Sequence, residues 1–513
     1  MKSWRQIMWA RVPLELARTD PDMAADGGGL VRSLGPIHLT LIGVGCAIGA
    51  GIFVLTGTAA ARYAGPAISI SYAMAGVVCV LTCLCYAELS AVIPAAGGSF
   101  SYARITLGRL PAWLVGCCMV FEYLAGGSTV AVGWSAYAQS LLAQFGLSLP
   151  WAVSGAPLEV VDNRLVPTGR IADLPAVLMT LGCTLILLRG LRGSALSNAL
   201  MVSVNIVVIV VVIVVGAYYV NPQNWVPFMP ARTPSGHFGV AGVFTAAAIA
   251  FYSYTGFEAT SNAARESRNP SRDVPISLLA SVVICVLLYT GIAFIMTGLA
   301  PYPKLDTASP IATALALASP KLNWLIMATD IGTVLGLGAA VLISFYSQSR
   351  IFYSMAVVGN LPPAFAHIHP RTRTPTLAVV WTGVGAALVA GVLPIELLGE
   401  LISLGTLIAY ASVCAGVLVL RRIRPDVARP FRVPLCPWLP LAALASCSVL
   451  MISLPRLTWL NMAAWIALCI VMFFVLESRA GPRGVEQGFG ARRGSALTTP
   501  AMAPPGAVPD KID

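Results

Sequence analysis

The sequence predicts an all-α polytopic membrane protein, and three observations lead to that prediction. Of the 513 residues, 57% are hydrophobic and only 10% are Asp, Glu, Lys or Arg, whereas an ordinary soluble domain carries roughly 25% charged residues. Apolar stretches recur from one end of the chain to the other, and basic residues fall mostly in alternate connecting segments. This composition excludes a disordered chain, a disulfide-rich secreted module and a protein that binds nucleic acid.

Twelve apolar stretches approach or exceed the length of about 20 residues that one membrane crossing needs. They cover 36–60, 66–93, 112–142, 172–189, 195–219, 238–262, 275–299, 324–356, 376–393, 395–420, 437–455 and 458–477. The first stretch is too long, too rich in glycine and too far from the N-terminus for a cleaved signal. We therefore expect twelve transmembrane helices in a lipid bilayer.

The basic residues predict the orientation of these helices. With the N-terminus in the cytoplasm, 25 of the 32 Lys and Arg lie in cytoplasmic segments. The seven outside are Arg62, Arg164, Arg170, Arg232, Lys304, Lys321 and Arg456. Cytoplasmic loops of membrane proteins carry an excess of Lys and Arg, so we expect both termini in the cytoplasm. The net charge of +11 then reflects the excess of Lys and Arg in the cytoplasmic segments and not a nucleic-acid partner.

The connecting segments and the cysteines suggest no further chemistry. Outer loops 143–171 and 300–323 have room for short helices, and the tail 478–513 has a composition typical of disorder. Of the twelve cysteines, eleven lie in long apolar runs and Cys436 lies at the edge of one. None has zinc-like spacing, so we interpret them as small packing residues and expect no metal and no cofactor.

The first apolar stretch has a feature that weakens a helix near its middle. Gly49 and Gly51 are separated only by Ala50, and glycine is unfavourable inside an α-helix. An unwound backbone is tolerated at membrane depth only where it lines a polar cavity. Close helix packing through small residues is the alternative explanation.

The sixth stretch has a comparable interruption. A patch rich in hydroxyl groups, Phe251 to Thr255, is followed by Gly256 and the carboxylate of Glu258. If the first five helices and the next five are repeats, the sixth helix is the counterpart of the first. Paired interrupted helices in matching halves indicate a transporter binding site.

Two facing helix breaks suit a particular kind of solute. The free N–H groups at one side of a break carry partial positive charge and hold a carboxylate. The free carbonyl groups at the other side hold an ammonium group or a cation. An α-amino acid has both groups, so it fits such a site without any charged side chain in the pocket.

Several motifs together resemble a known family. Gly45 to Phe53 is similar to the first-helix signature of the amino acid–polyamine–organocation superfamily. The other motifs are Tyr86-Ala87-Glu88-Leu89-Ser90, Pro94 to Ala103, Phe257-Glu258 through Pro270, Gln348-Ser349-Arg350, Leu420 to Asp426 and Arg429 to Pro434. Their order resembles the cationic amino acid transporter branch and its bacterial relatives, from about residue 34 to 476.

The resemblance implies a five-plus-five inverted-repeat fold (the LeuT-like arrangement) with broken helices one and six and two further helices. Its divisions are a cytoplasmic tail 1–33, repeats 34–220 and 238–420, a last helix pair 437–477 and a cytoplasmic tail 478–513. It also implies a bacterial inner membrane protein.

The resemblance further implies which residues meet the substrate. Ile48, Gly49, Ala50 and Gly51 would bind its carboxylate, while Tyr252, Ser253 and Thr255 would meet its amino group and side chain. Ser344, where relatives have a bulkier residue, would leave room for a longer side chain. A small polar residue in helix packing is the alternative there.

Three polar residues bear on coupling and gating. Glu122 lies deep in the third helix, where a carboxylate is costly and is a functional candidate as a proton carrier or a partner for a cationic substrate. Glu258 suits either capping of the second half-helix or a role in the pocket. Some bacterial relatives have a lysine at the position of Asn205, where it contacts the first helix. Asn205 cannot titrate, which argues against lysine-based proton coupling.

The expected function is a secondary active or facilitative amino acid transporter that works by alternating access. Arg, Lys and ornithine, or a broad range of amino acids, are the expected substrates. A proton-coupled symporter or an exchanger of neutral amino acids is the alternative, and a sensor that does not transport is a further one. An enzyme is not expected, because the four histidines are not clustered with carboxylates. Glu88 and Arg350, near cytoplasmic helix ends, are expected in inner-gate ion pairs.

Overall fold

The structure is a computed structural model that describes most of the apolar stretches. The described residues are 8–12, 34–93, 97–161, 164–189, 194–233, 238–372, 374–393, 395–454 and 456–480. Most of the predicted N-terminal tail 1–33, and the predicted disordered tail 478–513 after residue 480, lie outside them.

Every predicted apolar stretch contains at least one helix. In the first half the helices are α3 (Pro36–Ala47), α4 (Thr56–Ala59), α5 (Ile68–Val92), α6 (Gly98–Thr106), α7 (Arg109–Gln144), α8 (Leu174–Arg189) and α9 (Ser194–Ala217). In the second half they are α10 (Gly239–Ala250), α11 (Ala259–Asn262), α12 (Pro270–Leu299), α13 (Pro310–Ala318), α14 (Asn323–Val357), α15 (Thr376–Val392), α16 (Ile395–Ile423), α17 (Trp438–Ile452) and α18 (Arg456–Ala480).

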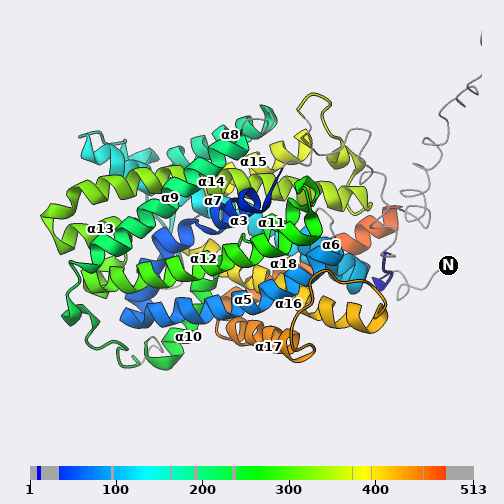
Figure 1. The fold of residues 1–513 in the computed structure, drawn as a ribbon. Helices are drawn as coiled ribbons and strands as arrows, with labels where there is room; N and C mark the ends of the chain where they lie inside the picture. Colours follow the sequence, from blue (N-terminus) through cyan, green and yellow to red (C-terminus); the bar gives the residue numbers. More distant parts are fainter. Residues whose placement is uncertain are drawn as a thin grey trace, which may run out of the picture.

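The long helices form one bundle in which elements far apart in sequence lie side by side. Helix α12 packs along α5, α14 packs along α7, and α15 packs against α8. The short helices α3 and α11, which belong to the two interrupted stretches, lie together within this bundle (Figure 1). The interruptions are therefore enclosed by helices from both halves of the chain.

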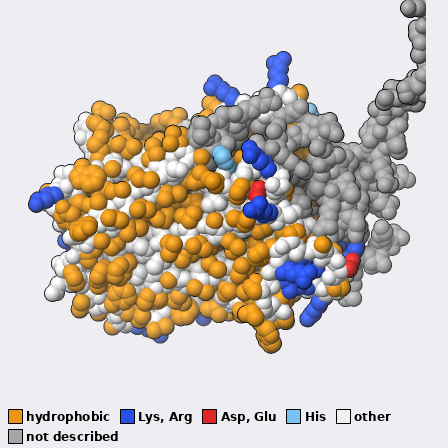
Figure 2. Space-filling view, viewed as in Figure 1, with side chains coloured by type: hydrophobic (Ala, Val, Ile, Leu, Met, Phe, Trp, Pro, Cys, Tyr) orange, Lys and Arg blue, Asp and Glu red, His pale blue; other side chains and the backbone are white. Residues whose placement is uncertain are grey.

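The surface of this bundle fits a bilayer. By length and composition, eight helices in the described part of the chain can cross a membrane, and four shorter apolar helices accompany them. Hydrophobic side chains cover most of the face in Figure 2, with Lys and Arg concentrated towards its ends. Large apolar side chains such as Leu178, Val207, Leu287 and Leu388 are exposed. Lipid tails solvate such side chains, so the protein is a polytopic membrane protein.

One connecting loop contains a feature that was not predicted. Loop 143–171 contains a short 3₁₀-helix, η5 (Trp151–Val153), and an antiparallel hairpin of β1 (Leu158–Val161) and β2 (Arg164–Pro167). The short helix that this loop was expected to have room for is present, and the hairpin was not predicted. The hairpin lies in a loop, so the unpaired edges of its two strands need not face hydrocarbon. Loop 300–323 contains α13 and two 3₁₀-helices, as predicted.

Ion pairs cluster at the end of the bundle where α5, α14 and α16 finish. Glu88 is fully buried and pairs with Arg421 and Arg429, while Arg350 pairs with Glu266 at 3.2 Å. Both predicted ion-pair residues are therefore paired. A charge removed from water requires such a partner, so these contacts tie the helix ends together.

The described parts nearest the two termini lie at this same end. Arg109, at the start of α7, pairs with Glu477 in the last helix at 2.8 Å. Arg104, in α6, donates a hydrogen bond to the carbonyl oxygen of Ala10. The described N-terminal segment and the end of α18 therefore lie near one another.

Candidate substrate site at two interrupted helices

The first interruption begins where α3 ends at Ala47. Ile48 leaves the helical conformation with φ −74° and ψ 80°, and the chain resumes as a wider π-helical turn, η2 (Gly51–Leu55). A Cβ atom on Gly51 would lie 2.4 Å from Ser253 Oγ. Glycine is therefore required because the two interrupted segments approach each other closely.

The second interruption follows α10. A 3₁₀ turn, η7 (Phe251–Tyr254), leads to the extended Thr255, and Gly256 then has φ +105° before α11 begins. This left-handed conformation favours glycine. A Cβ atom at Gly256 would also lie 2.9 Å from the backbone of Cys46. Both predicted interruptions are thus present, and they lie against each other.

A tyrosine of α5 joins the two interruptions. The hydroxyl group of Tyr72 lies 3.0 Å from Ser253 Oγ in η7, and it donates to the carbonyl oxygen of Gly51 at 3.3 Å. It also lies 2.6 Å from Thr56 Oγ1. One buried side chain therefore satisfies polar groups from both broken helices, which hydrocarbon cannot do.

A buried carboxylate anchors the segment after the second interruption. Glu258 is 1% exposed. It accepts hydrogen bonds from the N–H of Gly256 at 3.0 Å, from the hydroxyl group of Tyr123 at 2.8 Å and from that of Tyr410 at 2.6 Å. These donors come from the turn itself, α7 and α16. The carboxylate therefore fixes the turn of the broken helix between two neighbouring helices.

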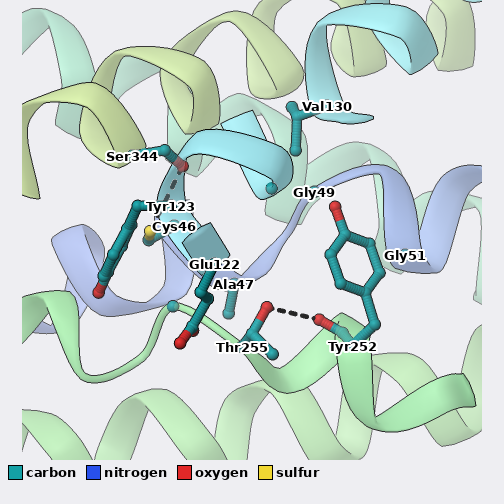
Figure 3. A pocket seen from close by; sticks show the side chains of 12 residues that line it. Cys46, Ala47, Gly49, Gly51, Glu122, Tyr123, Val130, Tyr252, Thr255 and Ser344 are labelled. Atoms are coloured by element: carbon teal, nitrogen blue, oxygen red, sulfur yellow. Dashed lines mark hydrogen bonds between the residues drawn. The ribbon is translucent and has the colours of Figure 1, made fainter. Parts of the chain in front are cut away.

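A pocket lies between the interruptions and helices α7 and α14 (Figure 3). Its lining residues are Cys46, Ala47, Gly49, Gly51, Glu122, Tyr123, Gly126, Val130, Tyr252, Thr255, Gly256 and Ser344. The free space between them is about 20 Å³, which is room for about one water molecule, so the pocket is nearly closed in this conformation and has to widen to hold a small solute. In Figure 3, Cys46 and Ser344 lie at one side of the pocket and Tyr252 at the other.

Six of the predicted site residues line this pocket. They are Gly49, Gly51, Glu122, Tyr252, Thr255 and Ser344. Thr255 donates its hydroxyl hydrogen to the carbonyl oxygen of Tyr252 at 2.8 Å, and Ser344 Oγ lies 3.9 Å from Cys46 Sγ. The pocket therefore combines hydroxyl groups, a thiol and backbone from both broken helices.

Five predicted residues do not line the pocket. Ile48, Ala50 and Ser253 are buried in the surrounding packing, and Ser253 binds Tyr72 instead. Glu258 is engaged by its three donors. Asn205, in α9, faces α14, where a Cβ atom on Gly336 would lie 1.8 Å from its Nδ2 atom. Its contact with Gly336 places it beside the eighth predicted stretch, and α9 also packs against α3 in the first.

Glu122 is the acidic residue among those that line the pocket. It is 4% exposed, it lines the pocket, and its Oε1 atom has no hydrogen-bond partner in the described part of the chain. An unpartnered buried carboxylate oxygen is costly. A cation or a proton that enters the pocket relieves that cost.

Six lining residues were missed by the sequence prediction. They are Cys46, Ala47, Tyr123, Gly126, Val130 and Gly256. Gly256 had already marked the second interruption. A signal existed for two more, because Gly126 and Val130 follow Glu122 at intervals of four residues. That spacing places all three on one face of a helix.

Residues 34–476 match the family model described as amino acid permease. This chain belongs to the amino acid permease family. The match confirms the predicted membership of the amino acid–polyamine–organocation superfamily, and the family is one of transporters, not enzymes.

Named relatives of this permease differ in what their names say they carry. It is 40% identical over 450 residues to the methylthioribose transporter of Bacillus subtilis (strain 168), covering 88% of this chain and 94% of that protein. It is 37% identical over 451 residues to the branched-chain amino acid permease BcaP of the same organism, with the same coverage. It is 36% identical over 399 residues to the vacuolar cationic amino acid transporter 4 of Arabidopsis thaliana, covering 77% of this chain and 64% of that protein.

Proposed function

We propose that this permease is a secondary amino acid transporter of the bacterial inner membrane that works by alternating access. It has twelve transmembrane helices, arranged as repeats 34–220 and 238–420 with a final pair at 437–477, and both termini are cytoplasmic. The placement of the two interrupted helices in matching halves supports the inverted repeat. The excess of basic residues on one side supports the orientation.

The observation that carries the proposal is the meeting of two interrupted helices at one pocket. Gly49 and Gly51 bring the backbone just before η2 and at its start to the pocket, and the N-terminal end of a helix favours a carboxylate. The end of η7, at Tyr252 and Thr255, supplies backbone carbonyl and hydroxyl groups for an ammonium group. An α-amino acid satisfies both ends.

We assign cationic amino acids, such as Lys, Arg or ornithine, as the preferred substrates within a broad range. The free Oε1 atom of Glu122 in the pocket supports this assignment, because a buried carboxylate is stabilised by a cationic partner. The plant relative named as a cationic amino acid transporter is consistent with it.

A second candidate is a proton-coupled symporter or an exchanger of neutral amino acids. The relative named as a branched-chain amino acid permease favours it, and Glu122 would then hold a proton instead of facing a cationic side chain. Asn205 cannot carry the coupling proton. If neither solute moved and binding alone occurred, the protein would be a sensor.

The test uses purified protein in two steps. A thermal-shift screen with Lys, Arg, ornithine, Leu, Val, Ala and methylthioribose identifies ligands, and counterflow in proteoliposomes then measures the exchange of each ligand. Exchange of Lys or Arg that exceeds that of Leu supports the first assignment. Exchange of Leu or Val alone supports the second, and binding without exchange under any gradient supports the sensor.

A further inference from the structure

Four glycines line the pocket, and three of them are required by packing. An added Cβ atom would lie 3.0 Å from Val130 Cγ2 at Gly49, 2.4 Å from Ser253 Oγ at Gly51, and 2.8 Å from Cys46 Sγ at Gly256. Gly51 and Gly256 let neighbouring backbones approach one another, and Gly49 leaves room for the side chain of Val130. Their absence of a side chain is explained without any ligand.

The fourth glycine, Gly126, has no such explanation. A Cβ atom there would meet no atom within 4 Å, although Gly126 lies inside the 36-residue helix α7 and lines the pocket. Glycine is a poorer helix former than alanine, and the fold has room for alanine at this position. The empty space beside Gly126 is therefore part of the pocket and not a packing requirement.

The neighbours of Gly126 on the same face of α7 define where this space leads. Val130, one turn further along, contacts the segment at Gly49, and Glu122, one turn before, presents its free Oε1 atom. Each step is about 6 Å along the helix axis. The space at Gly126 thus lies between the first interruption and an unpartnered carboxylate.

We propose that Gly126 forms the floor of a side-chain subsite and sets the upper size limit of the substrate. This inference rests on the proposed function, in which the two interruptions hold the carboxylate and amino groups. The side chain of the substrate then passes over Gly126, and a long cationic side chain reaches Glu122. A side chain at position 126 occupies the same space and selects for small amino acids.

The test compares Gly126→Ala and Gly126→Leu with the wild type in counterflow of Gly, Ala, Leu, Lys and Arg. We expect Gly126→Leu to lower exchange of Leu, Lys and Arg by about 10-fold or more. Exchange of Gly and Ala should stay within about 2-fold of wild type, because those substrates leave the space empty. Gly126→Ala should give an intermediate loss for the long substrates and keep the thermal midpoint of the wild type.

Gly182 provides the matched control. It also lies inside a helix, α8, and an added Cβ atom there meets nothing within 4 Å, but it does not line the pocket. Gly182→Leu should leave the ratio of long to small substrates unchanged. The subsite is overturned if Gly126→Leu lowers all five substrates equally, or if the Gly182 variant changes the ratio by the same factor.

Failure of the proposed function gives a different result. A wild type that exchanges no amino acid refutes that function, and the size limit is then measured with methylthioribose by thermal shift. Loss of its stabilising shift in Gly126→Leu, with the shift retained in Gly182→Leu, supports the subsite for another solute. The subsite is overturned if methylthioribose does not shift the thermal midpoint of the wild type, or if it shifts that of Gly126→Leu by as much as that of the wild type.

Discussion

Glu122 and Glu258 are both buried carboxylates at the centre of the bundle, but their hydrogen bonding differs. Glu258 accepts three hydrogen bonds, from one backbone N–H and two tyrosine hydroxyl groups. Glu122 lines the pocket with one oxygen that has no partner in the described residues. The comparison teaches that burial alone does not identify a functional carboxylate. A functional carboxylate is identified by an oxygen atom that lacks a hydrogen-bond partner, because only such an atom gains a new hydrogen bond from a ligand.

Replacing Glu258 should cause the largest effect. Glu258→Leu leaves the N–H of Gly256 and the hydroxyl groups of Tyr123 and Tyr410 without an acceptor, and each orphaned donor costs about 1–3 kcal/mol. We expect a loss of at least about 3 kcal/mol in the free energy of unfolding, seen as a large drop in the thermal midpoint in detergent. Glu258→Gln keeps one carbonyl oxygen and should lose less. A thermal midpoint of Glu258→Leu equal to that of the wild type would contradict the anchoring role.

Filling the first interruption should remove binding. In Gly51→Leu the Cβ atom meets Ser253 Oγ at 2.4 Å and Ser253 Cα at 2.6 Å, so the two interrupted segments must separate or the leucine must enter the pocket. We expect ligand-induced thermal shifts to vanish in this variant. The unliganded thermal midpoint serves as the control for folding. Retained shifts in a folded Gly51→Leu protein would show that the substrate binds elsewhere.

Replacing Glu122 should change transport while stability stays nearly constant. Glu122→Gln removes the negative charge without removing any bonded partner of the free oxygen, so the thermal midpoint should hold. Exchange of Lys and Arg should fall by about 10-fold or more, because a charge-assisted hydrogen bond is lost. Exchange of Leu should fall less.

The pH response gives a second measurement for Glu122. Protonation removes the charge that a cationic side chain needs, so wild-type exchange of Lys should rise with pH. Glu258 interacts electrostatically with Glu122, but it stays engaged by its three donors. The Glu122→Gln variant should therefore lose the pH dependence. An unchanged pH response in this variant would show that Glu122 carries neither proton nor cation.

The sequence was sufficient to predict the two interruptions but not the contacts that hold them. Gly49, Gly51 and Gly256 mark the breaks because glycine is unusual in the middle of an apolar helix. The positions of Ser253 and Glu258 suggested a pocket role as strongly as that of Thr255. Only the fold shows that Tyr72 and Tyr410, 181 and 152 residues away respectively, occupy their polar groups.

The lining of the pocket by α7 was partly predictable. Glu122 stood out because a carboxylate is rare at membrane depth, and the helical period then places Gly126 and Val130 on its face. That step depends on knowing which face of α7 meets the pocket, and nearly every side of α7 contacts another helix. The hairpin at Leu158–Pro167 was missed because strands of four residues carry little pattern.

Tyr410→Phe should have the smallest effect and sharpens the comparison between the carboxylates. It removes one of the three donors to Glu258 and keeps the ring, which packs edge-on against Tyr86 and Phe257. The loss should be about 1–2 kcal/mol, because a hydrogen bond to a charged group is worth roughly 1.5–3 kcal/mol and two donors remain. Tyr123→Phe removes the other tyrosine donor and should cost a similar amount. The double variant should lose more than the sum, because Glu258 then keeps only the Gly256 N–H and its charge is left poorly satisfied in a dry interior. If the losses in the free energy of unfolding are simply additive, Glu258 finds other hydrogen-bond donors in the double variant. Glu258 and Glu122 would then differ only in how many donors each has.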